Sequence, residues 1–329
     1  MMTIKEFQEW FDQQFFIFLK NKSTAFIGYS NTESISNIVS YVDTYARGGK
    51  RLRPYMAYVG YTVEDGGEDI FPLYAAIELL HLFCLVHDDV MDNEAVRHGT
   101  LTVHRHLEKQ YNSVEIGRAL AILLGDLLLA WAYECIAEME MIEPYTIDET
   151  TRQFARAISE VIHGQMLDVS ALPQYPQSKD MILDTMELKS ARYSFFHPLY
   201  LGMLTAGAGE DAELFAEEYG VNIGMAFQLQ DDIADYISDV AEGKQTLLSW
   251  YISNEAPADY QKAFETYKNK EWSDQDELTL IKLLEDSGAI VFSEKQTEDY
   301  FLAAEDAIFN HNKTDEEIWQ EIIDELKKE

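Results

Sequence analysis

The stretch that most constrains the fold of this chain runs from Glu78 to Gly99 and reads ELLHLFCLVHDDVMDNEAVRHG. Its apolar residues follow an Ala-rich segment, and together they predict a buried helix. Asp88 and Asp92 are four residues apart, so on a helix their carboxylates project from one face, with Asp89 beside them. Three carboxylates this close repel one another and hold protons unless a cation lies among them. A site whose ligands are all oxygen atoms favours Mg²⁺. This ion takes one or two protein carboxylates and completes its shell with water and substrate phosphate.

The same spacing of aspartates recurs in the segment QLQDDIAD, at Asp231, Asp232 and Asp235. It again follows a largely apolar stretch, Val221 to Phe227. One such triplet is equally compatible with a solvated helix end, but chance rarely places two of them at the polar ends of separate apolar helices. If the two helices face each other, the acids line two walls of one cavity, and metals between them can hold a diphosphate.

Length and composition favour a single large all-α domain over residues 1–329. A chain of 329 residues leaves room for two domains, but no Pro-, Gly- or Ser-rich linker divides it, and it has only 7 prolines. Helix formers dominate, and no hairpin signal is flanked by alternating strands. The longest apolar run, Ala119 to Ala137, contains Asp126 and Glu134, so we expect a buried core helix there and no membrane span.

The charge and the cysteines restrict the partners and the compartment. A formal net charge of −34 disfavours nucleic acid and anionic membrane surfaces as partners. A diphosphate site in so acidic a chain therefore needs a local excess of positive charge, supplied by metal ions and by a few cationic side chains. Cys84 and Cys135 lie in apolar helical sequence without the spacing of a zinc site or a disulfide framework, and the N-terminus lacks the features of a signal peptide. A cytoplasmic location fits.

Cations cluster in the segment RGGKRLRP, residues 47–54. Two glycines let the backbone turn tightly and approach a ligand, while Lys50, Arg51 and Arg53 supply a point charge and planar forks that suit diphosphate oxygens. The segment is also compatible with a solvated turn. In so acidic a chain, we favour the anion site.

The helix that carries the first triplet also carries His81, seven residues before Asp88 and on the same stripe. His81 is either a satisfied core residue or a donor to a substrate phosphate. Below the acids on this stripe lie Cys84 and Leu80, flanked by Phe83, and these three side chains are expected to form the wall beneath the metals.

Another helix with unusual features reads MELKSARYSFFHPLYLG, residues 186–202. It carries Lys189 into an apolar setting and is expected to break near Pro198, which frees a carbonyl one turn earlier. A carbonyl or hydroxyl aimed into an apolar cavity stabilises a cation, although Lys189 is also compatible with a snorkelling surface lysine. After the second triplet, Ser238 to Lys244 is expected to be a short polar loop.

Two readings compete with a diphosphate site. Glu78 with His81, and Glu160 with His163, form Glu-x-x-His pairs like those of di-iron four-helix bundles, but that reading leaves the aspartates without a role. The other competing interpretation is a non-catalytic partner subunit, and the intact acidic and cationic residues argue against it.

The chain resembles the trans-type polyprenyl (isoprenyl) diphosphate synthases over nearly its whole length. Five motifs in the family's order carry the resemblance: GGKRLRP at 48–54, ELLHLFCLVHDDVMD at 78–92, GQMLD at 164–168, KSARYSFFHPL at 189–199 and FQLQDDIAD at 227–235. The resemblance implies an all-α bundle of long antiparallel helices around a deep apolar cavity, usually a homodimer. Ring-forming terpene synthases share a first Asp-rich motif but generally lack GGKRLRP and a second full triplet, so they are the enzymatic alternative.

The resemblance also implies a role for each matching residue. The diphosphate of isopentenyl diphosphate would be held by Lys50, Arg53 and His81. Two Mg²⁺ ions would be bound by Asp88 and Asp92 and a third by Asp231, with support from Asp89, Asp232 and Asp235. The allylic diphosphate would be contacted by Arg97, Lys189 and Lys244, with Lys189 oriented by Asp168. The allylic cation would face Ser190, Gln228 and the carbonyl of Lys189.

Three departures from the family pattern qualify these roles. The family often has Arg-Arg-Gly where this chain has Arg97-His98-Gly99, so isopentenyl binding through His98 is expected to be weaker and pH-dependent. Ser190 replaces the usual Thr and keeps the hydroxyl. The loop after Asp235 is shorter than usual, so Lys244 matches either of two family lysines.

Product length depends in this family on the bulk of the two residues four and five positions before the first aspartate. Here these are Cys84 and Phe83, above Leu80. One aromatic residue with a small neighbour resembles short-chain synthases, with a C20 product favoured over C15.

Overall fold

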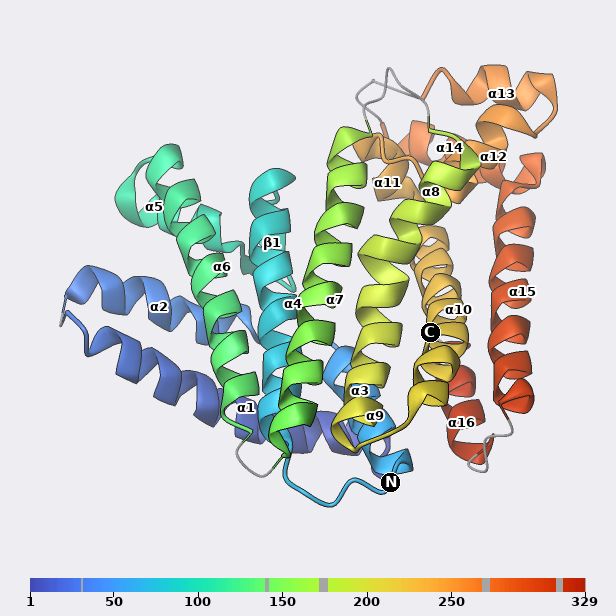
Figure 1. The fold of residues 1–329 in the computed structure, drawn as a ribbon. Helices are drawn as coiled ribbons and strands as arrows, with labels where there is room; N and C mark the ends of the chain where they lie inside the picture. The colour runs from blue at the N-terminus through green and yellow to red at the C-terminus, as the bar shows by residue number, and fades with distance from the viewer. Residues whose placement is uncertain (31, 140–141, 172–176, 268–272, 312–315, 329) are drawn as a thin grey trace. The chain divides into compact units, whose positions relative to one another are not determined.

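The structure is a computed structural model, and it describes residues 1–30, 32–139, 142–171, 177–267, 273–311 and 316–328. These residues are almost entirely helical, which confirms the all-α prediction (Figure 1). They divide into two compact units, the first of residues 1–153 and 201–208 and the second of residues 154–200 and 209–329. The expectation of a single domain stays a prediction.

The first unit is built around two apolar helices that pack against each other, α4 and α6. Its elements are α1 (Ile4–Ile27), α2 (Glu33–Tyr45), α3 (Leu52–Val63), α4 (Phe71–Met91), β1 (Val96–Arg97), β2 (Thr100–Leu101), α5 (Val103–Tyr111), α6 (Val114–Ala137) and the start of α7 (Pro144–Ser170). In α1, Phe7, Phe11, Phe15 and Leu19 recur every four residues and are fully buried, so one aromatic stripe fixes this helix to the core.

By length and composition, α4 and α6 are long and apolar enough to cross a membrane. Both instead contribute buried side chains to the core of the first unit, and buried Glu78 of α4 is ion-paired to Arg51. The run from Ala119 to Ala137 does form a helix that packs into the core, but it is buried on one face only, because Ile122 and Leu123 are exposed.

The second unit packs α10 against α15 and against a wide helical segment, η1. Its elements are the remainder of α7, α8 (Lys179–Met186), η1 (Glu187–Phe196), α9 (His197–Thr205, which ends in the first unit), α10 (Glu210–Ala234), α11 (Tyr236–Glu242), α12 (Leu247–Asn254), α13 (Ala258–Phe264), α14 (Asp274–Ser287), α15 (Ala289–Asn310) and α16 (Glu316–Leu326). The segment η1 is a π-helix and lies between α8 and α9 in Figure 1.

Two local expectations from the sequence are wrong. The chain does not break near Pro198, because Pro198 is the second residue of α9, where the missing amide is tolerated; the irregular winding precedes it, in η1. The segment Ser238–Lys244 is not simply a loop, because residues 236–242 form α11, which ends at Gly243 in a left-handed conformation (φ 76°).

The described residues also contain a small hairpin that the sequence reading missed. Strands β1 and β2 pair antiparallel, with Arg97 opposite Thr100, so only His98 and Gly99 form the turn. Both have positive φ, 48° and 77°, as a two-residue type I′ turn requires. The signal was the X-Gly pair, but the flanking strands have two residues each and leave no alternating pattern.

Candidate active site

The first acidic triplet lies at the C-terminal end of α4, as predicted. Asp88 is half-buried, and Asp92 is exposed and caps the helix. Asp89 points the other way and is only 1% exposed. Its carboxylate accepts hydrogen bonds from the Tyr45 hydroxyl at 2.6 Å and from Nε of Arg97 at 2.7 Å, and Nη2 of Arg97 forms an ion pair with it at 2.7 Å. Asp89 therefore supports the other two acids from behind.

Arg97 is placed by the hairpin. Its Nη2 lies 2.7 Å from Asp89 and 3.9 Å from Asp88, so one guanidinium is shared between the buried acid and the half-buried one. Burial and the charge of Asp89 raise the pKa of the Tyr45 phenol, so Tyr45 remains a protonated donor. The exposed His98 in the turn lies against Gly48 of the basic segment.

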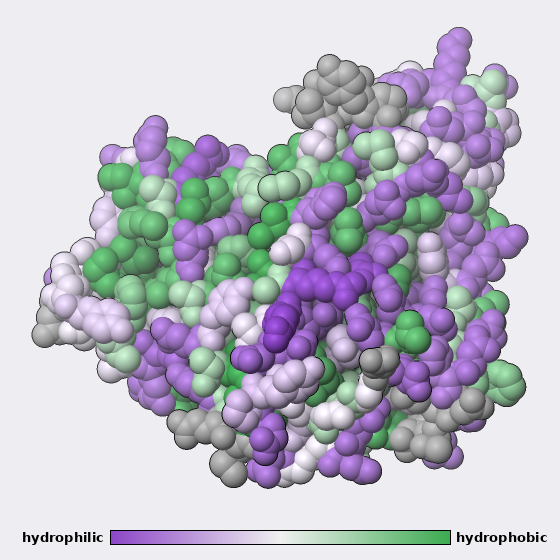
Figure 2. All heavy atoms as spheres, viewed as in Figure 1, coloured by the Kyte–Doolittle hydropathy of each residue, from purple (hydrophilic) through white to green (hydrophobic). Residues whose placement is uncertain are grey.

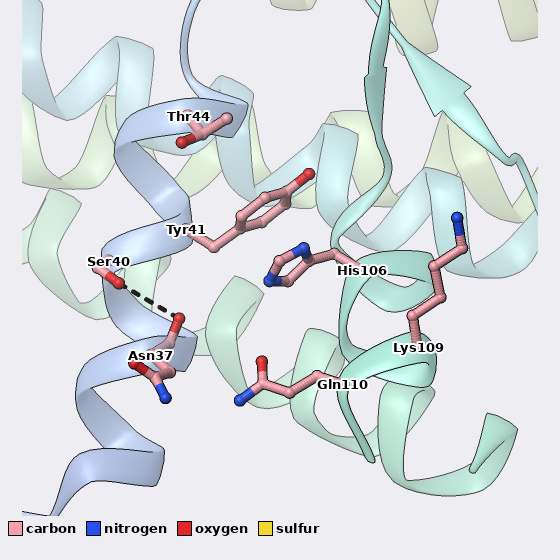
Figure 3. A pocket seen from close by; sticks show the side chains of 7 residues that line it. All are labelled: Asn37, Ser40, Tyr41, Thr44, His106, Lys109 and Gln110. Carbon is pink, nitrogen blue, oxygen red and sulfur yellow. Dashed lines mark hydrogen bonds between the residues drawn. The ribbon is translucent and has the colours of Figure 1, made fainter. Parts of the chain in front are cut away.

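Helix α2 carries a second tyrosine that contacts the hairpin, Tyr41. Its hydroxyl donates to the carbonyl of Leu101 in β2 at 2.8 Å, and its ring stacks on His106 of α5 with centroids 3.7 Å apart. Figure 3 shows this stacked pair in a pocket between α2 and α5, whose lining also includes Asn37, Ser40, Thr44, Lys109 and Gln110. None of the predicted site residues lines this pocket.

The basic segment is a strained turn in which Lys50, Arg51 and Arg53 have different roles. Gly48 and Gly49 have φ of 96° and 81°, and Arg51 is left-handed at 54°. The interpretation of Arg51 as a diphosphate ligand is wrong, because its side chain is only 3% exposed and donates to Glu78 at 2.6 Å and Asp12 at 2.7 Å. Buried arginine is stable only when its donors are satisfied, and these bonds fix the turn to α4 and α1. Lys50 is exposed and Arg53 half-buried.

His81 lies beside Arg53 on the facing helix. Nη1 of Arg53 is 3.2 Å from Nε2 of His81, and because a guanidinium can only donate, Nε2 accepts and the imidazole is neutral. Burial and the charges of Arg53 and Arg51 lower the pKa of His81 well below its usual range. The structure thus keeps His81 uncharged and brings it together with Arg53.

The residues predicted for the floor of the cavity lie one to two turns below Asp88. Leu80 and Phe83 are buried, and Cys84 is half-buried. The Phe83 ring contacts His87 with centroids 4.6 Å apart. Their role in product length stays a prediction.

In the second unit, the predicted residues surround one pocket of about 250 Å³. Its lining includes Asp168, Lys189, Ser190, Gln228, Asp231, Asp232, Asp235 and Lys244. Lys189 of η1 is ion-paired with Asp168 of α7, and Lys244 is ion-paired with buried Asp239 at 3.2 Å. A polar pocket that contains both acids and cations is suited to a metal-bound anion.

The second triplet repeats the arrangement of the first. Asp231 and Asp235 are exposed, whereas Asp232 is buried and accepts a hydrogen bond from the Gln228 amide at 2.8 Å. Burial raises the pKa of Asp232 to about 7; Asp239 and Asp231 act in the same direction, and the Gln228 bond opposes them. In each triplet the middle aspartate is thus a buried support, while the outer two are accessible. The expectation that the two triplets face each other stays a prediction.

The di-iron reading is disfavoured because its glutamates already have cationic partners. Glu78 binds Arg51, and Glu160 binds Arg192, Arg156 and His197. Among the described residues, no three His, Cys, Asp or Glu side chains are grouped closely enough to form a metal site by themselves. Accessible aspartate pairs fit Mg²⁺ better, because Mg²⁺ needs only one or two protein carboxylates when a substrate supplies phosphate oxygens.

The two tyrosines of α2 provide a test of the support under Asp89. Tyr45→Phe removes a hydrogen bond to a buried carboxylate and should lower the free energy of unfolding by about 1.5–3 kcal/mol. Tyr41→Phe, the matched control, removes a bond to a neutral carbonyl and should cost about 0.5–1.5 kcal/mol. Urea unfolding of both variants measures the difference, and a cost for Tyr41→Phe equal to or above that for Tyr45→Phe would contradict this account.

Comparison with known proteins places this site in a family. The polyprenyl synthetase family model matches residues 33–282. A short chain isoprenyl diphosphate synthase from Methanocaldococcus jannaschii is 32% identical over 73% of this chain and 73% of its own length. A geranylfarnesyl diphosphate synthase from Aeropyrum pernix is 30% identical over 79% of this chain and 83% of its own length.

Solved structures agree. The geranylgeranyl pyrophosphate synthase of the archaeon Geoglobus acetivorans aligns with a TM-score of 0.80 at 25% identity, over 98% of both chains. A geranylgeranyl pyrophosphate synthase from Corynebacterium glutamicum, complexed with isoprenyl diphosphate and magnesium, aligns with a TM-score of 0.87 at 23% identity, over 99% of this chain and 98% of its own, and shares the fold. Each of the two acidic triplets has a buried middle aspartate, and the family model matches most of the chain. The chain therefore belongs to the polyprenyl synthetase family.

Proposed function

We propose that this protein condenses isopentenyl diphosphate with an allylic diphosphate (dimethylallyl, geranyl or farnesyl) to a short all-trans polyprenyl diphosphate, with C20 favoured over C15. The observation that carries the proposal is the pairing of accessible aspartates with cations in each unit. Asp88 lies beside Arg97, and Asp231 shares a pocket with Lys189 and Lys244. The curated relatives, named short chain, geranylgeranyl and geranylfarnesyl synthases, support the reaction class.

The chain's own residues divide the work of binding two diphosphates. Lys50 and Arg53 hold isopentenyl diphosphate through charge, and neutral His81, fixed by Arg53, contributes an uncharged imidazole to the same site. His98, exposed in the hairpin turn beside Gly48, adds a charge only when it is protonated. Arg97, Lys189 and Lys244 bind the allylic diphosphate.

The acids make a metal site for the same substrate. We assign Asp88 and Asp92 to two Mg²⁺ ions and Asp231 to a third, with Asp89, Asp232 and Asp235 as support. Bound Mg²⁺ supplies positive charge that stabilises the departing diphosphate.

Bond making then follows from where charge develops. The allylic C–O bond ionises, and Ser190, Gln228 and the Lys189 carbonyl stabilise the allylic cation by their dipoles. The isopentenyl double bond attacks that cation and forms the new C–C bond. One proton is lost from the condensed cation to the released diphosphate, which restores a double bond.

Metal removal and a single acid test this assignment. Purified protein with Mg²⁺, labelled isopentenyl diphosphate and geranyl diphosphate should form a linear product, and EDTA should abolish it. Asp88→Ala should lower kcat by roughly 10³-fold, by analogy with the loss of one preorganised electrostatic group. Asp126→Ala, which removes an exposed aspartate of α6, is the control and should stay within about twofold. Normal turnover by Asp88→Ala would overturn the assignment.

Phe83 is proposed as the floor that ends chain growth, with Leu80 and Cys84 beside it. Phe83→Ala opens space beneath the acids, so the longest product should gain at least one isoprene unit. Val86→Ala, another buried truncation in α4, should leave product length unchanged. Chromatography of the labelled products measures both, and an unchanged length in Phe83→Ala would mean that other residues form the floor.

A homodimer is the proposed assembly, and an exposed apolar face supports it. Figure 2 shows hydrophobic residues gathered over α5 and α6, where Val114, Ile116, Ile122 and Leu123 are exposed. Light scattering should give twice the mass of one chain, and Leu123→Glu should shift it toward one. Leu214→Glu, on α10 and similarly exposed, should not, and a monomeric parent protein would contradict the proposal. We also propose a cytoplasmic location, where the free thiols of Cys84 and Cys135 remain reduced.

A further inference from the structure

The segment η1 carries two of the proposed substrate residues, Lys189 and Ser190, into the pocket of the second unit. It has the winding of a π-helix over residues 187–196. Such winding is rare and usually limited to a single turn inside an α-helix, because its hydrogen-bond geometry is unfavourable. A ten-residue π segment therefore needs contacts from outside its own backbone to stabilise it.

Glycines on both neighbouring helices make room for the wide backbone. A Cβ at Gly164 of α7 would clash with the backbone nitrogen of Lys189, and one at Gly224 of α10 would lie 2.6 Å from the Ala191 Cα. Gly220, one turn before Gly224, stands in the same relation to Phe196 at 2.8 Å. These contacts permit the wide winding, but small residues alone do not select it over an ordinary α-helix.

Arg192 supplies a selective contact. It lies in the middle of η1, its side chain is only 9% exposed, and it donates to carboxylates on three elements. Its Nε lies 2.7 Å from Glu160 of α7, and its Nη1 lies 2.7 Å from Glu217 of α10 and 3.3 Å from Glu187 of η1 itself. Burial acts to raise the pKa of Glu160, but hydrogen bonds from His197 and Arg192 lower it overall, so this carboxylate is charged.

The contact between Glu187 and Arg192 depends on the winding. At about 100° per residue in an α-helix, side chains five residues apart point about 140° away from each other. In a π-helix, whose hydrogen bonds join residues five apart, the same two side chains lie on one face of the helix, about one turn apart. The ion pair within η1 therefore forms in the π winding and is lost in the α winding.

We propose that Arg192 is a positioning residue whose ion pairs with Glu187, Glu160 and Glu217 hold η1 in its π winding and thereby set Lys189 and Ser190 for the allylic substrate. The inference rests on the proposed function, which gives these two residues their substrate. Rewinding η1 as an α-helix would rotate Lys189 and Ser190 relative to Arg192 and change which side chains face the pocket.

A nearby arginine provides a matched control. Arg156 of α7 also donates through Nε to Glu160, at 2.8 Å, and through Nη1 to a glutamate of α10, Glu213, at 2.8 Å. It makes the same two kinds of bond as Arg192 but has no ion pair within η1, and it is more exposed, at 42%. Arg192→Lys and Arg156→Lys therefore each replace a guanidinium that binds Glu160 by an ammonium group of the same charge.

The experiment combines kinetics with hydrogen exchange. In Arg192→Lys we expect kcat to fall at least tenfold and KM for geranyl diphosphate to rise. KM for isopentenyl diphosphate should stay within twofold, because its proposed ligands Lys50, Arg53 and His81 lie on elements other than η1. Amides of residues 187–196 should exchange at least tenfold faster. In Arg156→Lys all four quantities should stay within twofold.

A second variant keeps the proposal testable if Arg192→Lys does not fold. Glu187→Gln alters a partly exposed side chain and removes charge only from the pair within η1. It should shift kcat and exchange in the same direction by two- to fivefold. Unchanged kinetics and exchange in both variants, or equal losses in Arg156→Lys, would overturn the inference. An inactive parent protein would overturn the proposed function instead, and exchange in η1 would still report on Arg192.

Discussion

The burial of one carboxylate behind two accessible ones is the constraint on which the candidate site depends. Asp89 faces the interior and is held by Tyr45 and by both arms of Arg97, so its charge is compensated inside the protein. Since Tyr45 ends α2 and Arg97 belongs to the hairpin, this single carboxylate fixes two elements to the end of α4. Asp88 and Asp92 are left accessible at the end of the helix that this support anchors.

The same division between supporting and accessible charges organises the basic turn. Although the chain has a net charge of −34 and few cations, Arg51 is buried in an ion pair with Glu78 and does not face a ligand. Burying such a pair brings little net stability, but the turn with left-handed residues at Gly48, Gly49 and Arg51 depends on it, because the pair fixes the turn to α4. Lys50 and Arg53 are thereby presented beside His81, which stays neutral. This family member is a prenyltransferase, and contacts within the protein itself help to place its cations.

In the second unit, a helical segment with π winding, η1, carries the proposed substrate residues Lys189 and Ser190. Three glycines allow η1 to wind widely between α7 and α10, and the carboxylates around Arg192 lie where that winding needs them. Asp232 differs from Asp89 in having an amide as its hydrogen-bond partner, and burial therefore raises its pKa to about 7. One aspartate triplet thus rests on a compensated charge and the other on a carboxyl group that is partly protonated near neutrality.

The grouping of Lys189 with Asp231 in one pocket was implied only by the family resemblance. The sequence by itself determined the all-α fold and the helix that ends in Asp88 and Asp92. It could do so because apolar periodicity and an i, i+4 spacing act within one element. Tertiary structure alone decided that Asp89 and Arg51 face inward, that His98 and Gly99 form a hairpin turn, that residues 236–242 are helical, and that η1 is a π-helix. The inward-facing side chains and η1 depend on partners distant in the sequence, such as Tyr45 for Asp89 and Glu160 for Arg192, whereas the hairpin strands and α11 are too short to leave a clear pattern. Short-range patterns cannot specify these pairings, because the energy of a buried charge is set by the donors that the whole fold brings to it.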